Sequence, residues 1–282
     1  MEFGTEEQKR RFLPDLLSGR KLGAFAVTEP AAGSDLGHQQ TTAVEQEDGW
    51  ILNGSKIFIT NGYYAGTYFV TAVTDRTKGS RGISGLIVEK GTPGFSFGTK
   101  EKKMGIRGSA TYELVFQNCK IPRENLLDET GKGFKMVLTT LDGGRIGVAA
   151  QALGIAQGAI DHCKKYVTEH TQGDLRISQY QFTQFELADM QSCVDAARLL
   201  VYRAAQAKQD HEPFSHLAAM GKLYAAEAAT NVTRRCVQLA GYDGYSRSFP
   251  FERLMRDAKI TEIYEGTSEV QKIVISSWMG IK

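Results

Sequence analysis

The chain has 282 residues, of which 41% are hydrophobic and 23% charged, and its formal net charge is +2. This composition indicates a soluble globular protein with room for one large domain or two ordinary ones. Charges of both signs are spread along the chain, which argues against a surface that binds nucleic acid or a membrane through bulk charge. The four cysteines form no C-x-x-C pair and the five histidines no H-E-x-x-H motif, so we expect neither a disulfide framework nor a metal site.

The first predicted element is a helix over residues 5–17, in a segment that is charged from its second residue onward. A lone helix ahead of a β-domain buries little surface, so we expect residues 1–23 to be the remnant of a longer N-terminal helical region. The charged start has no secretory signal, and no apolar run is long enough for a transmembrane helix.

Residues 24–125 are predicted to form a β-domain. Four segments are rich in β-branched and aromatic residues, and turn sequences such as TKGSRG and GTPG separate them. Short strands at this spacing are typical of a small barrel or sandwich. No G-x-G-x-x-G follows a strand and no G-x-x-x-x-G-K-[ST] occurs, so neither a Rossmann dinucleotide site nor a P-loop is expected. The predicted strands are residues 50–60, 67–73, 84–90 and 111–119.

Residues 126–282 are predicted to form a four-helix bundle, which makes the whole an α+β protein of several domains. Ser178 and Gln181 form a capping-box pattern at the start of the second helix. Gly266 interrupts the last helical stretch, and Thr267 can cap the helix that follows. The other predicted helices are residues 134–170, 215–241 and 250–263, with Pro250 as the first helical position. The apolar face of the second helix is predicted as Phe182, Phe185, Met190, Val194, Ala197 and Val201.

Three glutamates, Glu262, Glu265 and Glu269, lie close together in TEIYEGTSEVQK, residues 261–272. Glu265 falls in the break between two predicted helices, where its side chain can point into a cavity. Burial would raise the pKa of this carboxyl, while the N-terminus of the next helix would favour the anion. A raised pKa suits a general base that works near neutral pH. From spacing alone, ordinary surface charge is the alternative for all three glutamates.

Three other stretches are candidate ligand contacts. The small-residue turn in AFAVTEPAAGSDLG, residues 24–37, would let backbone N–H groups approach a phosphate or the edge of a flavin ring. The aromatic and threonine of KIFITNG, residues 56–62, could stack on a planar ligand. Arg145 in LDGGRIG could pair with an anion. Each has an ordinary alternative: a plain turn, a core strand and a charge on a helix surface.

In this order and spacing, TEPAAGSD, KIFITNG, LDGGRIGVAAQALGIAQGA and MRDAKITEIYEGTSEVQ resemble the acyl-CoA dehydrogenase family, and within it the short-chain, butyryl-CoA type branch. The resemblance runs from about residue 4 to residue 278. It implies a β-domain and a helical bundle that hold FAD and an acyl-CoA thioester between them. It also implies that the family's N-terminal helical domain is missing here.

The resemblance implies a role for individual residues. Glu265 matches the catalytic base of this branch. The positions that match substrate contacts are Ser34, Asp142, Arg145 and Gly266. The positions that match cofactor contacts are Phe25, Val27, Thr28, Gly33, Ser34, Phe58, Ile59, Thr60, Gln181, Gln238, Gly241, Thr267 and Glu269.

The implied reaction is the α,β-dehydrogenation of a short-chain acyl-CoA to the trans-2-enoyl-CoA. Glu265 would remove the α-proton, and hydrogen bonds to the thioester carbonyl, one of them from the backbone N–H of Glu265, would stabilise the developing enolate. The β-hydrogen would leave as hydride to the flavin, and an electron-transfer flavoprotein would accept the electrons. The resemblance further implies a homo-oligomer, a dimer of dimers, in a bacterial cytoplasm or the mitochondrial matrix.

Two stretches depart from the family's pattern. HTQGD stands where relatives usually carry R-x-x-F-G, so His170, Gly173 and Asp174 replace Arg, Phe and Gly. That arginine pairs with the FAD pyrophosphate of a neighbouring subunit, and a neutral histidine cannot replace a bidentate guanidinium. In QLAGY, Tyr242 replaces a glycine near the adenine end. We therefore expect weak FAD binding, or a different hold on the AMP half of the cofactor.

Two alternatives to the dehydrogenase stay open. One is an oxidase or a redox-neutral acyl-CoA enzyme on the same scaffold, and oxygen consumption without an electron-transfer partner would reveal the oxidase. The other is a degenerate member that serves as a non-catalytic subunit or scaffold. The altered HTQGD and QLAGY stretches and the missing domain favour this second alternative, whereas the retained Glu265 opposes it.

Overall fold

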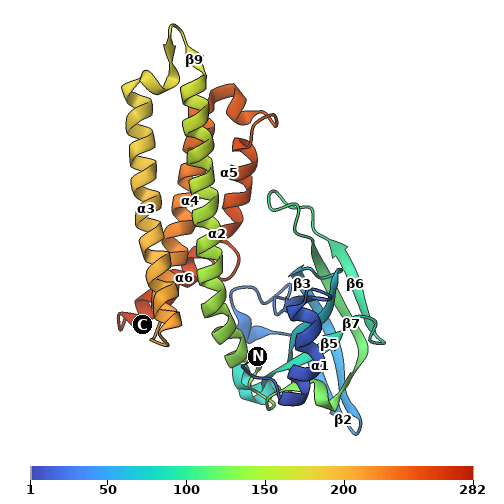
Figure 1. Ribbon diagram of the computed structural model, residues 1–282. Helices are drawn as coiled ribbons and strands as arrows, with labels where there is room; N and C mark the ends of the chain where they lie inside the picture. Colours follow the sequence, from blue (N-terminus) through green and yellow to red (C-terminus); the bar gives the residue numbers. More distant parts are fainter. Residues whose placement is uncertain (1, 282) are drawn as a thin grey trace. The chain divides into compact units, whose positions relative to one another are not determined.

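The computed structural model describes residues 2–281, so the first and last residues of the predicted domain ranges lie outside it. The chain forms two compact units. The first runs up to Lys103 and includes Arg107–Thr139, and it carries the main β-sheet. The second combines Met104–Ile106 with the chain from Thr140 onward and is mostly helical (Figure 1). The α+β class predicted from the sequence is confirmed.

The first unit contains an eight-stranded sheet of order β6-β7-β3-β2-β4-β5-β8, in which β1 pairs in parallel with β4. All four predicted strands are present, as β3, β4, β5 and β7. The sequence analysis missed β2, β6 and β8, which are short and mostly exposed or half-buried. The strands are β1 Leu22–Ala26, β2 Thr42–Gln46, β3 Gly49–Thr60, β4 Ala65–Val73, β5 Ile83–Glu89, β6 Phe95–Lys100, β7 Thr111–Pro122 and β8 Leu126–Leu127.

Helix α1, Glu6–Leu17, belongs to this first unit. Thr5 caps it in a reciprocal capping box with Gln8. The helix buries Phe12, and the Gln8 side chain donates hydrogen bonds to the carbonyl oxygens of Glu124 (2.7 Å) and Leu126 (2.8 Å). The first predicted helix is thus confirmed, and it is tied to the β-domain by polar contacts more than by apolar area.

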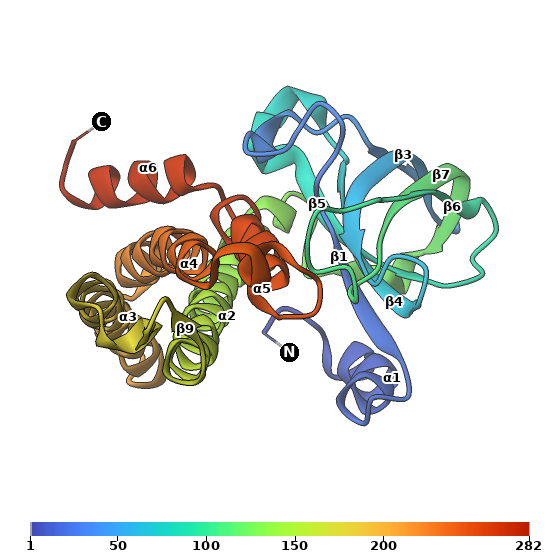
Figure 2. The same cartoon turned by 90° about the horizontal axis from the view of Figure 1, so that it is seen from above.

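The second unit is built on long helices. In both views α2, α3 and α4 run alongside one another (Figures 1 and 2). Their shared core is made mostly of small side chains such as Ala152, Ala156 and Ala229, which allow close helix packing. Among residues 2–281, no helix has the length and apolarity to span a membrane. The helices are α2 Gly133–Glu169, α3 Gln181–Gln209, α4 Ser215–Tyr245, α5 Phe251–Lys259 and α6 Ser268–Trp278, and the hairpin β9 Thr171–Gln172 with β10 Leu175–Arg176 separates α2 from α3.

The predicted start of α3 was wrong. Ser178 lies in a 3-10 turn, Ile177–Gln179, and Tyr180 is the N-cap without a side-chain cap bond. The buried face of α3 follows Thr183 and Met190, which leaves Phe182 and Phe185 flanking it, 66% and 63% exposed. Four positions of the predicted apolar face are therefore buried, whereas Phe182 and Phe185 at its start are exposed.

Two further helix ends differ slightly from prediction. Gly241 marks a break, with φ at 58°, but α4 resumes after it as far as Tyr245. Pro250 is the N-cap of α5 and not its first residue, and α5 ends at Lys259 before a 3-10 turn, η5 (Ile260–Glu262).

The predicted cap of α6 is confirmed: the Thr267 side chain accepts a hydrogen bond from the backbone N–H of Val270 at 3.3 Å. Replacing Thr267 by alanine leaves that N–H without its protein partner, so we expect the free energy of unfolding to fall by about 1 kcal/mol. Urea unfolding measures the change. Ser276→Ala is the matched control, because this hydroxyl bonds only within α6, to the Ile273 carbonyl. An equal loss in both variants would contradict the capping role.

Candidate active site

Glu265 lies in the turn between η5 and α6, where the sequence predicted a break. Its backbone is in the left-handed region, with φ at 56°, and Gly266 follows with φ at 87°. An L-residue rarely adopts this conformation, and it persists where surrounding contacts enforce it. Burial raises the pKa of the Glu265 carboxyl, while the charges of Arg145 and Lys222 oppose that rise. The Glu265 carboxylate is therefore a stronger base than an exposed glutamate, as a general base requires.

Two side chains that the sequence analysis missed hold this turn. The Lys222 ammonium on α4 donates to the Gly266 carbonyl oxygen at 2.7 Å. The Gln271 amide on α6 donates to the same oxygen at 2.8 Å and to the Glu265 carbonyl oxygen at 3.3 Å. Both side chains are fully buried. A lysine within the alanine-rich stretch AAMGKLYAAEAA was the available signal, since a cation on a buried helix face needs a partner.

Helix α2 passes directly against the Glu265 carboxylate. A Cβ atom built on Gly144 would lie 2.5 Å from Oε2 of Glu265. The next residue, Arg145, is only 4% exposed and pairs with Asp142 at 2.6 Å, and the Ser215 hydroxyl donates to the same aspartate oxygen. The structure thus brings the predicted Glu265, Gly266 and Arg145 into one region of the helical unit.

Several buried polar atoms near this turn have no hydrogen-bond partner among the described residues. They are Nε of Arg145, Oγ of Ser268 and Oε1 of Gln271. Buried polar groups are nearly always paired in folded proteins. Unpaired groups beside a candidate base fit a site that receives a polar ligand.

Gly144 offers a sharp test of this packing. In Gly144→Ala the new methyl group would push the Glu265 carboxylate from its position, although alanine favours the helix by about 1 kcal/mol. We expect the melting temperature to be kept or raised, and any reaction in which the Glu265 carboxylate acts as the base to slow at least about tenfold. Gly154→Ala is the control, because a Cβ on Gly154 of the same helix meets nothing within 4 Å. Equal activity in both variants would contradict contact between α2 and the carboxylate.

In the first unit, a buried ion pair fixes the loop of the TEPAAGSD stretch. Lys56 Nζ lies 2.7 Å from the Glu29 carboxylate, and the two side chains are 0% and 3% exposed. Lys56 also donates to the Val27 carbonyl at 3.0 Å and to Gln39 at 2.8 Å. The backbone N–H of Ile57 donates to the Thr28 carbonyl. The loop and strand β3 are therefore held together at the two stretches that the sequence singled out.

These two stretches present different groups to solvent. Phe58 has φ at 58° and is 59% exposed, and Gly33, Ser34 and Thr60 are exposed as well. A Cβ on Gly33 would meet nothing within 4 Å. An exposed aromatic ring beside a loop of small residues suits a flat ligand. In contrast, Val27 is buried just after β1, Ile59 is buried in the sheet core, and Phe25 stacks on Phe69.

The remaining predicted positions lie elsewhere on the helical unit. Gln181, Gln238, Gly241 and Glu269 are exposed. Hydrogen bonds at the start of α6, from the backbone of Glu269 itself and from Thr267, hold the pKa of Glu269 below its usual range.

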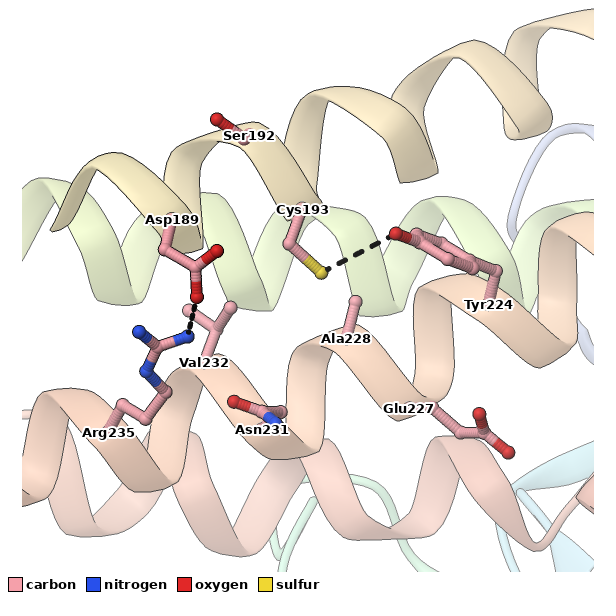
Figure 3. Close-up of a pocket in the computed structure, with 9 residues that line it drawn as sticks. All are labelled: Asp189, Ser192, Cys193, Tyr224, Glu227, Ala228, Asn231, Val232 and Arg235. Carbon is pink, nitrogen blue, oxygen red and sulfur yellow. Dashed lines mark hydrogen bonds and ion pairs between the residues drawn. The ribbon is translucent and has the colours of Figure 1, made fainter. Parts of the chain in front are cut away.

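A separate groove of about 510 Å³ lies between α3 and α4 (Figure 3). Arg235 pairs with Asp189 there at 2.7 Å, and the Cys193 thiol faces the Tyr224 hydroxyl at 3.9 Å. None of the predicted site residues lines this groove. Among the described residues, no group of three or more His, Cys, Asp or Glu side chains is arranged to hold a metal ion.

Comparison with known proteins gives the family. Residues 24–119 match the acyl-CoA dehydrogenase middle domain, and residues 131–280 match the acyl-CoA dehydrogenase C-terminal domain. The chain therefore belongs to the acyl-CoA dehydrogenase family, a family of oxidoreductases, as its motifs predicted.

Short-chain members of the family are similar to this chain over nearly all of its length. The chain is 54% identical to the short-chain specific acyl-CoA dehydrogenase of Clostridium acetobutylicum, covering 98% of this chain and 73% of that protein. It superposes on the butyryl-CoA dehydrogenase of Megasphaera elsdenii with a TM-score of 0.97 at 53% identity, covering 99% of this chain and 73% of the other. It is also 52% identical to the acryloyl-CoA reductase (NADH) of Anaerotignum propionicum, covering 98% and 70%.

Proposed function

We propose that this chain catalyses the α,β-dehydrogenation of short-chain acyl-CoA thioesters with FAD as cofactor. The observation that carries the proposal is Glu265: a half-buried carboxyl with a raised pKa, held in a left-handed turn beside unpaired buried polar atoms. The likeness to short-chain acyl-CoA dehydrogenases supports the substrate class.

The residues present fit a bound flavin. In the first unit, the exposed Phe58 ring and the small-residue turn at Gly33 and Ser34 would hold a flat, polar-edged group. In the second unit, the capped start of α6 at Thr267 offers backbone N–H groups. When bound, the flavin supplies an acceptor for the β-hydrogen as hydride.

In the proposed reaction, the proton is removed by a side chain of this protein, Glu265. Glu265 would take the α-proton of the thioester, and burial favours that transfer because it makes the carboxylate more basic than in water. Arg145 and Lys222 oppose this rise in the pKa of Glu265 and so favour the ionised form that can accept the proton. Asp142 and Arg145 are proposed as substrate contacts beside it.

The partners of this reaction are also proposals. Electrons would pass to an electron-transfer flavoprotein. A homo-oligomer is supported by the large apolar side chains exposed on α3, and its arrangement as a dimer of dimers is proposed from the resemblance to the family. These side chains are Phe182, Phe185, Leu199 and Tyr202, between 61% and 71% exposed.

A second candidate, a non-catalytic family member, is favoured by the position of His170. Its ring stacks on Tyr166 with centroids 3.9 Å apart, and Nδ1 lies 2.9 Å from the Tyr166 carbonyl oxygen. Because that carbonyl can only accept, Nδ1 carries the proton and the imidazole is engaged within the helical unit. His170 is thus poorly placed to replace an arginine that reaches a diphosphate.

One experiment separates the two candidates. The visible spectrum of the purified protein is recorded, and butyryl-CoA is then added without oxygen. A flavin band that bleaches would support bound FAD and α,β-dehydrogenation together. A colourless protein that stays colourless with added FAD would refute the enzyme and favour the scaffold.

A further inference from the structure

Lys222 is a buried cation that the proposed chemistry does not use directly. It is 0% exposed, and burial lowers its pKa to about 8, against the opposing charge of Glu262. Its ammonium makes a 2.7 Å hydrogen bond to the Gly266 carbonyl oxygen. Burial of an ammonium group is costly unless partners compensate it. The hydrogen bond to the Gly266 carbonyl oxygen is therefore the contact through which Lys222 stabilises the turn.

Gln271 approaches the same carbonyl from another helix. Its amide nitrogen lies 2.8 Å from the Gly266 oxygen and 3.3 Å from the Glu265 oxygen. The Gly266 oxygen therefore accepts from α4 and from α6 at once. Between these contacts, Glu265 is kept at φ 56°, a conformation that a glutamate adopts only when its surroundings enforce it.

We propose that Lys222 and Gln271 form a clamp on the Gly266 carbonyl oxygen, and that this clamp sets the position of the Glu265 carboxylate. Both are positioning residues, because they act on the base through the backbone and touch neither substrate nor cofactor in the proposed reaction. The inference deepens the function proposed for Glu265 and rests on it.

The clamp also places a positive charge beside the base. The charged groups that face Lys222 are Glu262 from η5, Glu265 from the turn, Glu269 from α6 and Arg145 from α2. Removing the lysine charge leaves Arg145 as the cation that opposes the effect of burial on Glu265. The carboxylate would then bind its proton more tightly, so the acid limb of the kcat/KM profile would move to higher pH.

Lys222→Met tests the clamp, because methionine has a similar volume and relieves the buried charge. Two readouts are made on the full chain as purified. In hydrogen exchange, the peptide over residues 260–267 should exchange roughly tenfold faster, with α2 and α3 unchanged. In butyryl-CoA turnover, kcat should fall roughly tenfold to a hundredfold. The acid limb of the kcat/KM profile should move to higher pH by about one pH unit.

Lys272→Met is the matched control. This neighbouring lysine is 61% exposed and lies 3.8 Å from Glu227, so its loss removes a charge from α6 without touching the clamp. Its exchange and pH profile should equal those of the wild type. Gln271→Met removes the second donor to the Gly266 carbonyl and tests the same clamp if Lys222→Met does not fold.

The outcomes separate this inference from the proposed function. Wild-type exchange over residues 260–267 in a folded Lys222→Met or Gln271→Met would overturn the clamp, whatever the activity. A wild type that does not turn over butyryl-CoA would refute the proposed function. The hydrogen-exchange rates over residues 260–267 would still show whether the clamp exists. Faster exchange with an unshifted acid limb would also overturn the role assigned to Lys222 beside the base.

Discussion

Replacing Glu265 by glutamine is expected to remove the bleaching of the flavin by butyryl-CoA and to lower kcat/KM by about 10²- to 10⁴-fold. Glutamine has nearly the same shape and fits the same turn, but its amide cannot take a proton. Stopped-flow absorbance under anaerobic conditions measures the loss. The bound flavin and the melting temperature should stay close to those of the wild type, because the hydrogen bond from Gln271 goes to the backbone carbonyl oxygen of residue 265, which glutamine keeps.

The pH dependence provides an independent check on the base. Burial raises the pKa of Glu265, and only the ionised form can remove a proton. The kcat/KM of the wild type should therefore increase with pH through a value above the ordinary glutamate pKa of about 4.3. Glu262→Gln is the comparison variant: this carboxylate pairs with Lys259 at 2.5 Å and its charge acts on Lys222, so a smaller loss of activity is expected. If Glu262→Gln lost as much activity as Glu265→Gln, the choice of base would be wrong.

The fold was predictable where local signals were strong. The β-branched and aromatic residues of β3 and the cap at Thr267 are short-range features that can be read directly from the sequence. The start of α3 was not predictable in this way, because the β9–β10 hairpin and a 3-10 turn occupy the residues around Ser178. Phe182 and Phe185 differ for another reason: an apolar pattern marks one face of a helix, but it does not give how far along the helix the rest of the chain covers that face.

The candidate site was predictable only in part. Glu265 could be found because a glycine breaks the helix pattern next to it. Lys222, Gln271 and Gly144 could not, because each acts through a contact with a residue far away in the sequence. A lysine on an alanine-rich helix indicates an unusual environment but does not identify its partner, and only the packing of α4 and α6 against the turn identifies the Gly266 carbonyl.

Lys56→Met is expected to lower the free energy of unfolding by about 3–5 kcal/mol, because it leaves the Glu29 carboxylate buried without its cation. The methionine cannot replace the hydrogen bonds that Lys56 donates to Glu29, Val27 and Gln39. Urea unfolding at pH 7, below the Lys56 pKa of about 8, measures the loss. Glu45→Gln is the control, since its pair with Arg123 is more than half exposed on both sides and should contribute less than about 1 kcal/mol.

The pH dependence of this loss identifies its cause. Burial alone would raise the pKa of Glu29, but the Lys56 charge and hydrogen bonds outweigh burial and lower it. The pair therefore stabilises the fold above the ordinary glutamate pKa of about 4.3, and that stability is lost as the pH falls through the lowered value. The difference in the free energy of unfolding between wild type and Lys56→Met should decrease over the same pH range. A difference that is constant with pH would mean that the substitution acts through packing alone.

The same ion pair connects stability to the proposed cofactor site. Glu29 accepts from the backbone N–H groups of Gln40 and Thr41 while it holds Lys56, so the loop after Thr28 is fixed at both ends. In Lys56→Met the released loop would let Ser34 adopt several positions, and ordering it would reduce the free energy of flavin binding. FAD should therefore dissociate more readily from Lys56→Met than from Glu45→Gln, even at temperatures where both are folded. If the two variants retained FAD equally, the Glu29–Lys56 pair would contribute to stability alone, and other residues would account for flavin binding.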